Sequence, residues 1–401
     1  MLLPVDPSPI HPGELGELLL NVDSAFHRTV SADGRLERMA KILEPARTLV
    51  IRDHGRIVAS TGIYSRNLTV PGAVVPVAGV TQVGVQPSHR RRGMLTALMH
   101  RQLLDVHEGG REAIAALWAS EAAIYSRFGY GIAAWVGNLD ITSRDALLRV
   151  PTDLQVELHE PAEAIPAMRA VHDAVRPDWP GMLDRGEPWW ERAIRPDDDA
   201  EGPMRAAVSE GVAYAVYHVK PGFEDGRPSG EVHVRELVAT SPAGHAAIWR
   251  FLLELDLTRR LVWGMAPVDD PLPHMIGEAR AVRTTVSDGI WLRIVDLPRA
   301  LSERTYGEPF EVVMEVADEV CPWNGGRWAL RWDGSAATCG RTSLPATVAL
   351  GVADLGAAYL GGTPLEVLAR AGRVDELRAG ALAPVSRSFA GTRAPWCPEI
   401  F

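Results

Sequence analysis

Three consecutive arginines followed by a glycine form the strongest chemical signal in the sequence, at residues 90–93. An alternating strand pattern at residues 80–85 leads into this loop, and apolar residues recur at helical spacing after it. The N–H groups and positive dipole end of a helix N-terminus attract anions. Gly93 lets the backbone approach a phosphate closely, and guanidinium groups match phosphate oxygens. The pattern predicts a site for a phosphate-bearing ligand, whereas an isolated arginine run is usually a solvated turn.

A second signal lies at residues 117–131, which read Leu-Trp-Ala-Ser-Glu-Ala-Ala-Ile-Tyr-Ser-Arg-Phe-Gly-Tyr-Gly. Ser120 and Tyr125 follow a short apolar strand predicted at residues 113–118. A phenol with an ordinary pKa of about 10 is protonated at neutral pH, so Tyr125 has a proton to donate. The alternative is that Tyr125 is a core tyrosine on a buried helical turn.

The elements that must position these residues fall in the first part of the chain. Strands are expected at residues 48–53, 56–64, 68–77 and 80–85, with turns at His54-Gly55 and Pro71-Gly72. A helix is expected from about Arg90, and a helical turn at residues 122–127.

The middle part of the chain resembles a second copy of the first. Strands at residues 212–219 and 231–239 precede a helix at residues 245–257. The connecting loop, residues 240–244, has no arginine cluster. We interpret this as a duplication whose second copy has lost its ligand loop, although any two α/β units share such an order.

The last part changes character. Strands are expected at residues 310–317 and 326–332, with a hairpin turn at Asp333-Gly334, and short helices at residues 352–359, 363–371 and 374–381. The chain ends in the apolar, proline-containing tail Pro395-Trp-Cys-Pro-Glu-Ile-Phe401. Most termini are polar and frayed, so this tail is expected to be docked.

Composition limits the alternatives. A chain of 401 residues predicts two or three domains at roughly 150 residues each. The net charge of −10 disfavours nucleic acid and mildly favours cationic substrates, although it also serves solubility alone. No window of about 18 apolar residues predicts a membrane span, and no signal peptide is recognised. Three cysteines without CxxC spacing fit a reducing cytoplasm. No HExxH or G-x-S-x-G pattern predicts a metal site or a serine hydrolase.

Arg90-x-x-Gly93-x-Leu95 resembles the acyl-CoA-binding motif of the GNAT N-acetyltransferases, Gln/Arg-x-x-Gly-x-Gly/Ala, with Leu95 in place of the small residue. Residues 117–131 resemble the Eis (enhanced intracellular survival) branch of that superfamily, which also has the triple-arginine loop followed by an aliphatic residue. Further matches are residues 270–274, 283–285 and 288–293 and the C-terminal Phe401.

The resemblance implies an α+β and α/β architecture. Two tandem GNAT-like domains, the second degenerate, would be followed by a C-terminal α/β domain similar to sterol carrier proteins. The expected boundaries are 1–150, 151–295 and 296–401. Such proteins assemble as hexamers and transfer acetyl groups from acetyl-CoA to amines, often several amines of one aminoglycoside.

The resemblance also assigns roles to residues. Tyr125 matches the general acid, and the Phe401 α-carboxylate matches the general base. Contacts to acetyl-CoA are expected from residues of the strand, the basic loop and the second motif: Val83, Val85, Arg90, Arg91, Gly93, Met94 and Ser120. The Val83 N–H would polarise the thioester carbonyl.

Substrate contacts are less strongly indicated. Asp288 and Glu399 are candidates for pairing with ammonium groups, and Phe26 is a candidate pocket wall, but each has a structural alternative. Two other functions stay open: a non-catalytic scaffold that binds acyl-CoA or lipid, and a protein lysine acetyltransferase.

Overall fold

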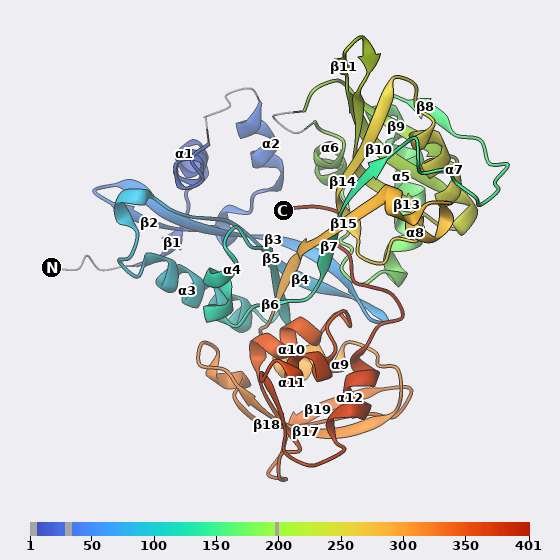
Figure 1. Cartoon of the computed structure of the whole chain (residues 1–401). Helices are drawn as coiled ribbons and strands as arrows, with labels where there is room; N and C mark the ends of the chain where they lie inside the picture. Colours follow the sequence, from blue (N-terminus) through green and yellow to red (C-terminus); the bar gives the residue numbers. More distant parts are fainter. Residues whose placement is uncertain (1–5, 29–33, 197–199) are drawn as a thin grey trace. The chain divides into compact units, whose positions relative to one another are not determined.

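The computed structural model of the chain describes residues 6–28, 34–196 and 200–401 (Figure 1). Two compact units can be distinguished. The first comprises Met1–Ala133, Ile290–Gly391 and Ile400–Phe401, and the second comprises Ala134–Gly289 and Thr392–Glu399. The predicted domain boundaries at residues 150 and 295 stay a prediction.

The first unit contains a seven-stranded sheet in the order β1-β2-β3-β4-β5-β16-β6. Its strands are β1 (Ser8–Pro9), β2 (Leu49–Asp53), β3 (Arg56–Val70), β4 (Ala73–Val85), β5 (Ile114–Trp118), β6 (Gly131–Ile132) and β16 (Ile290–Ile294). Its helices are α1 (Leu15–Ala25), α2 (Arg35–Ile42), α3 (Met94–Gly109) and α4 (Ala122–Tyr125).

Strand alternation places α1 and α3 on opposite faces of this sheet. Val50 of β2 packs with Leu18 of α1, whereas its neighbour Ile51 packs with Leu98 of α3. Successive side chains of a strand point to opposite faces, so both faces of β2 are covered and its apolar run is explained.

Most of the strands predicted here are confirmed. Residues 68–77 form two strands, β3 and β4, because the Pro71-Gly72 turn separates them, with Gly72 at φ +74°. The predicted strand at residues 80–85 is the end of β4. The helix expected from about Arg90 begins only at Met94, since Arg91 and Gly93 have positive φ angles of 61° and 80°.

The first unit also contains a five-stranded sheet in the order β19-β18-β17-β20-β21. The elements of this part are α9 (Leu297–Ser302), β17 (Phe310–Ala317), β18 (Gly326–Trp332), β19 (Ala337–Arg341), β20 (Val348–Gly351), α10 (Val352–Ala358), α11 (Leu365–Arg370), β21 (Val374–Glu376) and α12 (Leu382–Phe389).

The helix predicted at residues 374–381 is wrong. Val374 is buried and pairs with Leu350, so the segment begins as strand β21. Gly380 has a φ of +80°, which is outside the helical range, and the helix α12 begins only after it, at Leu382. The apolar spacing of residues 374–381 imitates a helix turn, and the sheet partner that decides the outcome is distant in sequence.

The second unit is built on a sheet in the order β15-β7-β14-β13-β10-β9-β8, with a small β11-β12 hairpin beside it. Its strands are β7 (Trp135–Thr142), β8 (Glu157–His159), β9 (Met204–Ser209), β10 (Ala213–Lys220), β11 (Phe223–Glu224), β12 (Arg227–Pro228), β13 (Gly230–Ala239), β14 (Thr258–Pro267) and β15 (Val282–Asp288). Its helices are α5 (Pro161–Val175), α6 (Glu187–Ala193), α7 (Pro242–Leu253) and α8 (Leu272–Met275).

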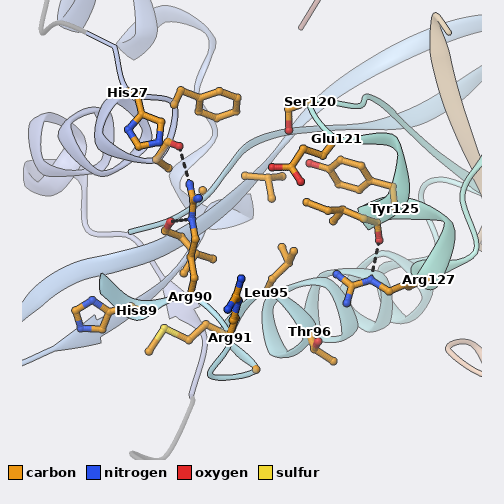
Figure 2. Close-up of a pocket in the computed structure, with 18 residues that line it drawn as sticks. His27, His89, Arg90, Arg91, Leu95, Thr96, Ser120, Glu121, Tyr125 and Arg127 are labelled. Carbon is orange, nitrogen blue, oxygen red and sulfur yellow. Dashed lines mark hydrogen bonds between the residues drawn. The ribbon is translucent and has the colours of Figure 1, made fainter. Parts of the chain in front are cut away.

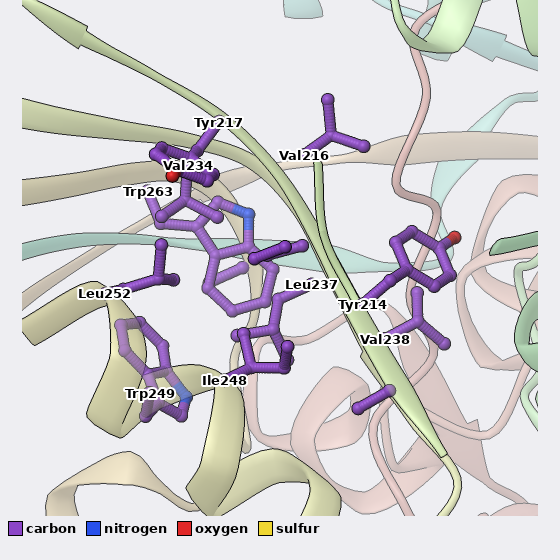
Figure 3. Close-up of a cluster of buried hydrophobic side chains, with 14 of the residues drawn as sticks. Tyr214, Val216, Tyr217, Val234, Leu237, Val238, Ile248, Trp249, Leu252 and Trp263 are labelled. Carbon is purple, nitrogen blue, oxygen red and sulfur yellow. The ribbon is translucent and has the colours of Figure 1, made fainter. Parts of the chain in front are cut away.

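Aromatic side chains fill the core of the second unit (Figure 3). Trp249 of α7 and Trp263 of β14 are fully buried, with ring centroids 6.0 Å apart. Tyr214 and Val216 of β10 belong to the same cluster. Burial of large aromatic groups dominates core energetics, so this unit has a core of its own.

The expected repeat is visible in the strand pairing. β4, α3 and β5 form a parallel strand–helix–strand unit in the first sheet, and β13, α7 and β14 form another in the second sheet. The two units therefore share this local topology.

Candidate functional site

A cavity of about 700 Å³ in the first unit gathers nine of the twelve predicted site residues (Figure 2). They come from the end of α1, the end of β4, the basic loop, the start of α3 and the segment after β5: Phe26, Val83, Val85, Arg90, Arg91, Gly93, Met94, Ser120 and Tyr125. The predicted phosphate loop and the predicted acid thus line one space.

Diverging strands account for the opening between β4 and β5. The two strands pair in parallel only from Val77 to Gly79 on β4. Farther along β4, Gln82 and Val83 stand opposite the single residue Thr61 of β3, which makes a β-bulge. Gln82 has a positive φ of 52°. The bulge includes Val83, and Val83 lines the cavity.

Side chains beneath the sheet hold this bulge. The buried Ser60 hydroxyl donates a hydrogen bond to the Gln82 carbonyl at 2.8 Å. The Asn21 amide of α1 in turn donates to the Ser60 hydroxyl at 3.0 Å. Sequence reasoning missed both residues, because the contacts join segments that are far apart in the chain.

The basic loop presents its two cavity arginines differently. Arg90 donates hydrogen bonds to the carbonyls of Ala25 (3.0 Å) and Val85 (3.4 Å), so its side chain ties α1 to the end of β4. The Arg91 side chain is exposed at the cavity. Gly93, at φ +80°, is the residue before α3 and places no side-chain cap on the first turn of that helix. The first turn of α3 therefore keeps the uncapped N–H groups that the predicted phosphate site requires, and the site itself stays a prediction.

A histidine connects the basic loop to strand β2. His89 Nε2 lies 3.0 Å from an Asp53 carboxylate oxygen, and its Nδ1 lies 2.9 Å from the Ser88 hydroxyl. The hydrogen bond with His89 lowers the pKa of Asp53 below its ordinary value. His89 also lines the cavity. His89 was not predicted as a site residue, because its only local signal is its place next to the arginine run.

Tyr125 is buried at the end of α4, 4% exposed. Burial raises its pKa above the ordinary value; the Ser120 hydroxyl opposes this shift and the Glu121 carboxylate adds to it. The phenol is therefore protonated at neutral pH. Figure 2 shows Ser120 and Glu121 beside Tyr125 on the same wall of the cavity. Glu121 lines the cavity too, and it was not among the predicted site residues.

The C-terminal Phe401 lies against β4 in the first unit. Its side chain is buried, and a β-carbon added at Gly79 would lie 3.2 Å from the Phe401 ring. Gly79 therefore leaves room for this ring on the strand whose end lines the cavity. The predicted docking of the tail is confirmed by the burial of Trp396, Cys397 and Phe401.

The two predicted acidic contacts belong to the second unit. Asp288 ends β15 opposite Trp135 of β7. A Glu399 carboxylate oxygen lies 3.5 Å from Nε of the buried Arg185. Both residues stay predictions as substrate contacts.

The start of α7 in the second unit differs from the start of α3, because a side chain caps it. The Ser241 side chain accepts a hydrogen bond from the Gly244 N–H at 3.1 Å, and Pro242 has no N–H to offer. In the first turn of this helix, Ser241 therefore accepts a hydrogen bond from one N–H group, and Pro242 leaves one fewer N–H group for a ligand. The arrangement supports the interpretation that the second copy has lost its ligand loop.

Two further observations concern ions and membranes. Among the residues that the structure places, no group of three or more His, Cys, Asp or Glu side chains is suited to hold a metal ion. Within the same described ranges, no helix has the length and apolar character to cross a bilayer.

Family models match three parts of the chain. Residues 6–133 and residues 181–294 each match an acetyltransferase (GNAT) domain, and residues 297–398 match a sterol carrier protein domain. The predicted order of two GNAT domains followed by a sterol-carrier-like domain is confirmed, on the mixed α/β sheets described above.

Known proteins resemble the chain over most of their length. The chain is 41% identical to an uncharacterized N-acetyltransferase of Streptomyces avermitilis, over 94% of this chain and 95% of that protein. It is 34% identical to the N-acetyltransferase Eis of Mycobacterium tuberculosis, over 85% and 86%. The crystal structure of Eis1 from Mycobacterium abscessus superposes with a TM-score of 0.88 at 32% identity, over 99% of this chain and all of that one.

Proposed function

Because this chain belongs to the Eis-like N-acetyltransferases of the GNAT superfamily, we propose that it acetylates primary amines of a small polycationic acceptor such as an aminoglycoside. Acetyl-CoA is the acetyl donor of GNAT acetyltransferases. The net charge of −10 favours a cationic acceptor. The observation that carries the proposal is that the basic loop, the bulged end of β4 and the buried Tyr125 all line the same cavity.

The cavity residues fit a CoA thioester in type and place. Arg91, Gly93 and Met94 surround the open first turn of α3 and would hold the pyrophosphate, with Arg90 positioning the loop. Val83 and Val85 at the bulged end of β4 would bind the pantetheine arm, and the Val83 N–H would donate to the thioester carbonyl. Acetyl-CoA supplies the activated acetyl group, and Ser120 would contact it beside Tyr125.

Two proton transfers complete the proposed mechanism. An amine with a pKa of about 10.4 must lose a proton before it can attack, and the Phe401 α-carboxylate would accept it directly or through water. Tyr125 would give its proton to the departing thiolate. Phe26, at the end of α1, lines the cavity and would form part of the acceptor pocket, with Asp288 as a further candidate contact.

The test is release of CoA thiol from acetyl-CoA by the protein with an untagged C-terminus. The acceptor panel holds aminoglycosides, polyamines and lysine-containing peptides. More than one equivalent of thiol released per aminoglycoside is the expected result, since it requires transfer to several amines. Release with peptides alone would favour protein lysine acetylation. Measurable acetyl-CoA binding without release for any acceptor would favour the non-catalytic scaffold.

We also propose a homo-hexamer in the cytoplasm, as the family resemblance implies. Light scattering of the purified protein should then give six times the 43.6-kDa chain mass. A monomer or dimer mass at micromolar concentration would contradict this assembly.

Loss of Arg91 is expected to weaken acetyl-CoA binding more than loss of its neighbour Arg92. Arg91 lines the cavity, whereas the Arg92 side chain donates to the Ser88 carbonyl at 2.9 Å. A charge-assisted phosphate contact of about 1.5 kcal/mol corresponds to roughly tenfold in Kd. Calorimetric titration should show about a tenfold rise for Arg91→Ala and about twofold for Arg92→Ala, which removes the same charge. Equal effects would mean that only net charge matters.

Adding a methyl group at Gly79 is expected to disturb the C-terminus and leave the basic loop intact. The added carbon would lie 3.2 Å from both the Phe401 ring and the Tyr64 carbonyl oxygen, closer than ordinary contact. Since the carbonyl is part of the sheet, the ring is the neighbour that can move. Gly79→Ala should lower kcat by about tenfold with little change in acetyl-CoA affinity. Unchanged kcat would argue against a catalytic terminus at this place.

A further inference from the structure

The C-terminal tail is anchored in the second unit up to Glu399. Trp396 is fully buried, with its ring 4.7 Å from Trp179 and 6.0 Å from Trp263 between centroids. Its indole N–H donates to the Met265 carbonyl at 2.7 Å, and its backbone N–H donates to the Pro180 carbonyl at 2.8 Å. Removal of a fully buried Trp side chain leaves a large cavity and is strongly destabilising, so this contact is a strong anchor.

The segment before Trp396 is fixed as well. The Ala394 N–H donates to the Asp269 carboxylate at 2.7 Å, and the Trp179 indole donates to the Ala394 carbonyl at 3.0 Å. The Arg393 guanidinium lies 3.3 Å from the centroid of the Trp179 ring. Gly181, at φ +100°, passes so close that a β-carbon there would lie 2.7 Å from the Trp396 carbonyl oxygen. Position 181 therefore has no room for a side chain, because the tail backbone packs directly against it.

A buried ion cluster lies at the end of the anchored segment. Arg185 donates two hydrogen bonds to Glu236, at 2.8 and 2.5 Å, and its side chain is 1% exposed. Among the described residues, the remaining Arg185 Nε–H finds no hydrogen-bond acceptor, and it faces the Glu399 carboxylate at 3.5 Å. Burial alone would lower the pKa of Arg185, but the Glu236 and Glu399 carboxylates raise it well above its ordinary value.

We propose that the second unit holds residues 392–399 in a socket, with Trp396 as the buried plug and the Arg185–Glu399 ion pair as the clasp, and that this anchor tethers the C-terminal carboxylate two residues farther along the chain. The proposal rests on the proposed role of Phe401 as the base. Two residues span at most about 7 Å, so fixing Glu399 confines the Phe401 carboxylate to a small volume. Glu399 is thus a positioning residue, and its pairing with Arg185 favours this role over substrate binding.

The socket gives the second unit a role that needs no ligand loop of its own. The first turn of α7 is capped by the Ser241 side chain. The core tryptophans Trp263 and Trp179 of the same unit contact Trp396 of the tail. A base carried on a chain end requires such support, because an untethered terminus samples many positions and loses the gain from proximity.

Two substitutions loosen the socket by different means, and a third is the control. Glu399→Gln removes the charge of the clasp at almost unchanged size. Gly181→Ala pushes a methyl group against the Trp396 backbone without changing charge. Glu160→Gln is the matched control, since Glu160 pairs with Arg205 at 2.8 Å in the same unit but is 62% exposed. Melting curves should confirm that all three variants are folded.

The first readout is removal of Phe401 by carboxypeptidase A, followed by mass spectrometry of the intact chain. We expect Glu399→Gln and Gly181→Ala to lose Phe401 about tenfold faster than the parent protein, because cleavage requires the tail to leave its site. Glu160→Gln should match the parent. Equal rates for all four proteins would overturn the proposal.

The second readout separates positioning from folding. In the two socket variants kcat should fall about tenfold while the KM for acetyl-CoA stays within about twofold, since that cavity lies in the first unit. Faster loss of Phe401 with unchanged kcat would also overturn the proposal. If the parent protein acetylates no acceptor, the proposed function fails, and the socket is then judged by the proteolysis rates alone.

Discussion

Replacing Tyr125 by phenylalanine is expected to lower kcat by about 100-fold or more while the KM for acetyl-CoA changes little. The substitution removes one oxygen and keeps the ring that packs near Tyr130, at 6.1 Å between centroids. Without the phenol, the departing thiolate has to take its proton from water. An interaction made only in the transition state affects kcat and kcat/KM together.

Tyr130 offers the matched control for this experiment. Its ring is equally buried, but it is not among the residues that line the cavity, and its hydroxyl has no hydrogen-bond partner among the described residues. Tyr130→Phe should therefore keep kcat close to that of the parent protein and should not lower the melting temperature. A similar loss of activity in both variants would mean that Tyr125 acts through packing and not as an acid.

The pH profile adds an independent check on Tyr125. Burial raises its pKa above the ordinary value of 10.0, so the acid form persists to higher pH than for a free tyrosine. The loss of kcat caused by deprotonation of an acid sets in as pH rises through its pKa. Any alkaline fall due to Tyr125 should thus lie above pH 10, and Tyr125→Phe should abolish it. A fall near neutral pH would belong to another group.

The predictable part of the site was the part that is local in sequence. The strand at residues 80–85, the basic loop and the helix after it form one continuous segment, so pattern and motif sufficed to predict that Val83, Arg91 and Gly93 lie close together. The helix start was placed too early, because the loop residues Arg91 and Gly93 take positive φ angles that the apolar spacing does not encode.

Contacts between distant segments escaped prediction. β16 follows the long segment Ala134–Gly289 of the second unit in sequence, yet it pairs with β5 and β6 in the first sheet. Its apolar run, Ile-Trp-Leu-Arg-Ile, fits any buried strand, so nothing local selects the partner. The same reason hides the Asn21–Ser60 support of the bulge, the Asp53–His89 brace and the Arg185–Glu399 pair. The two residues of each pair become neighbours only when the chain is folded.

The position of the C-terminal carboxylate carries the second large prediction. Adding a single arginine after Phe401 is expected to lower kcat by about 10- to 100-fold, because the charge moves by up to about 3.5 Å and small misplacements of a catalytic group are costly. The Phe401 ring, which lies beside Gly79 in the parent protein, is expected to stay there in this variant, so acetyl-CoA affinity should be preserved. The side chain of arginine is also no acceptor for acetyl groups of the expected kind.

Trimming provides the control within the same protein sample. Carboxypeptidase B removes a terminal arginine but leaves the native phenylalanine end, so treatment of the extended protein should restore kcat to that of the parent. Recovery on removal of one residue cannot be explained by misfolding during expression. An extended protein with full activity would contradict the role of the Phe401 carboxylate, and Tyr125 would then need a different partner to remove the proton from the amine. Because the socket around Trp396 and Glu399 is upstream of the added residue, it should stay intact, so the loss isolates the place of the charge from the anchoring of the tail.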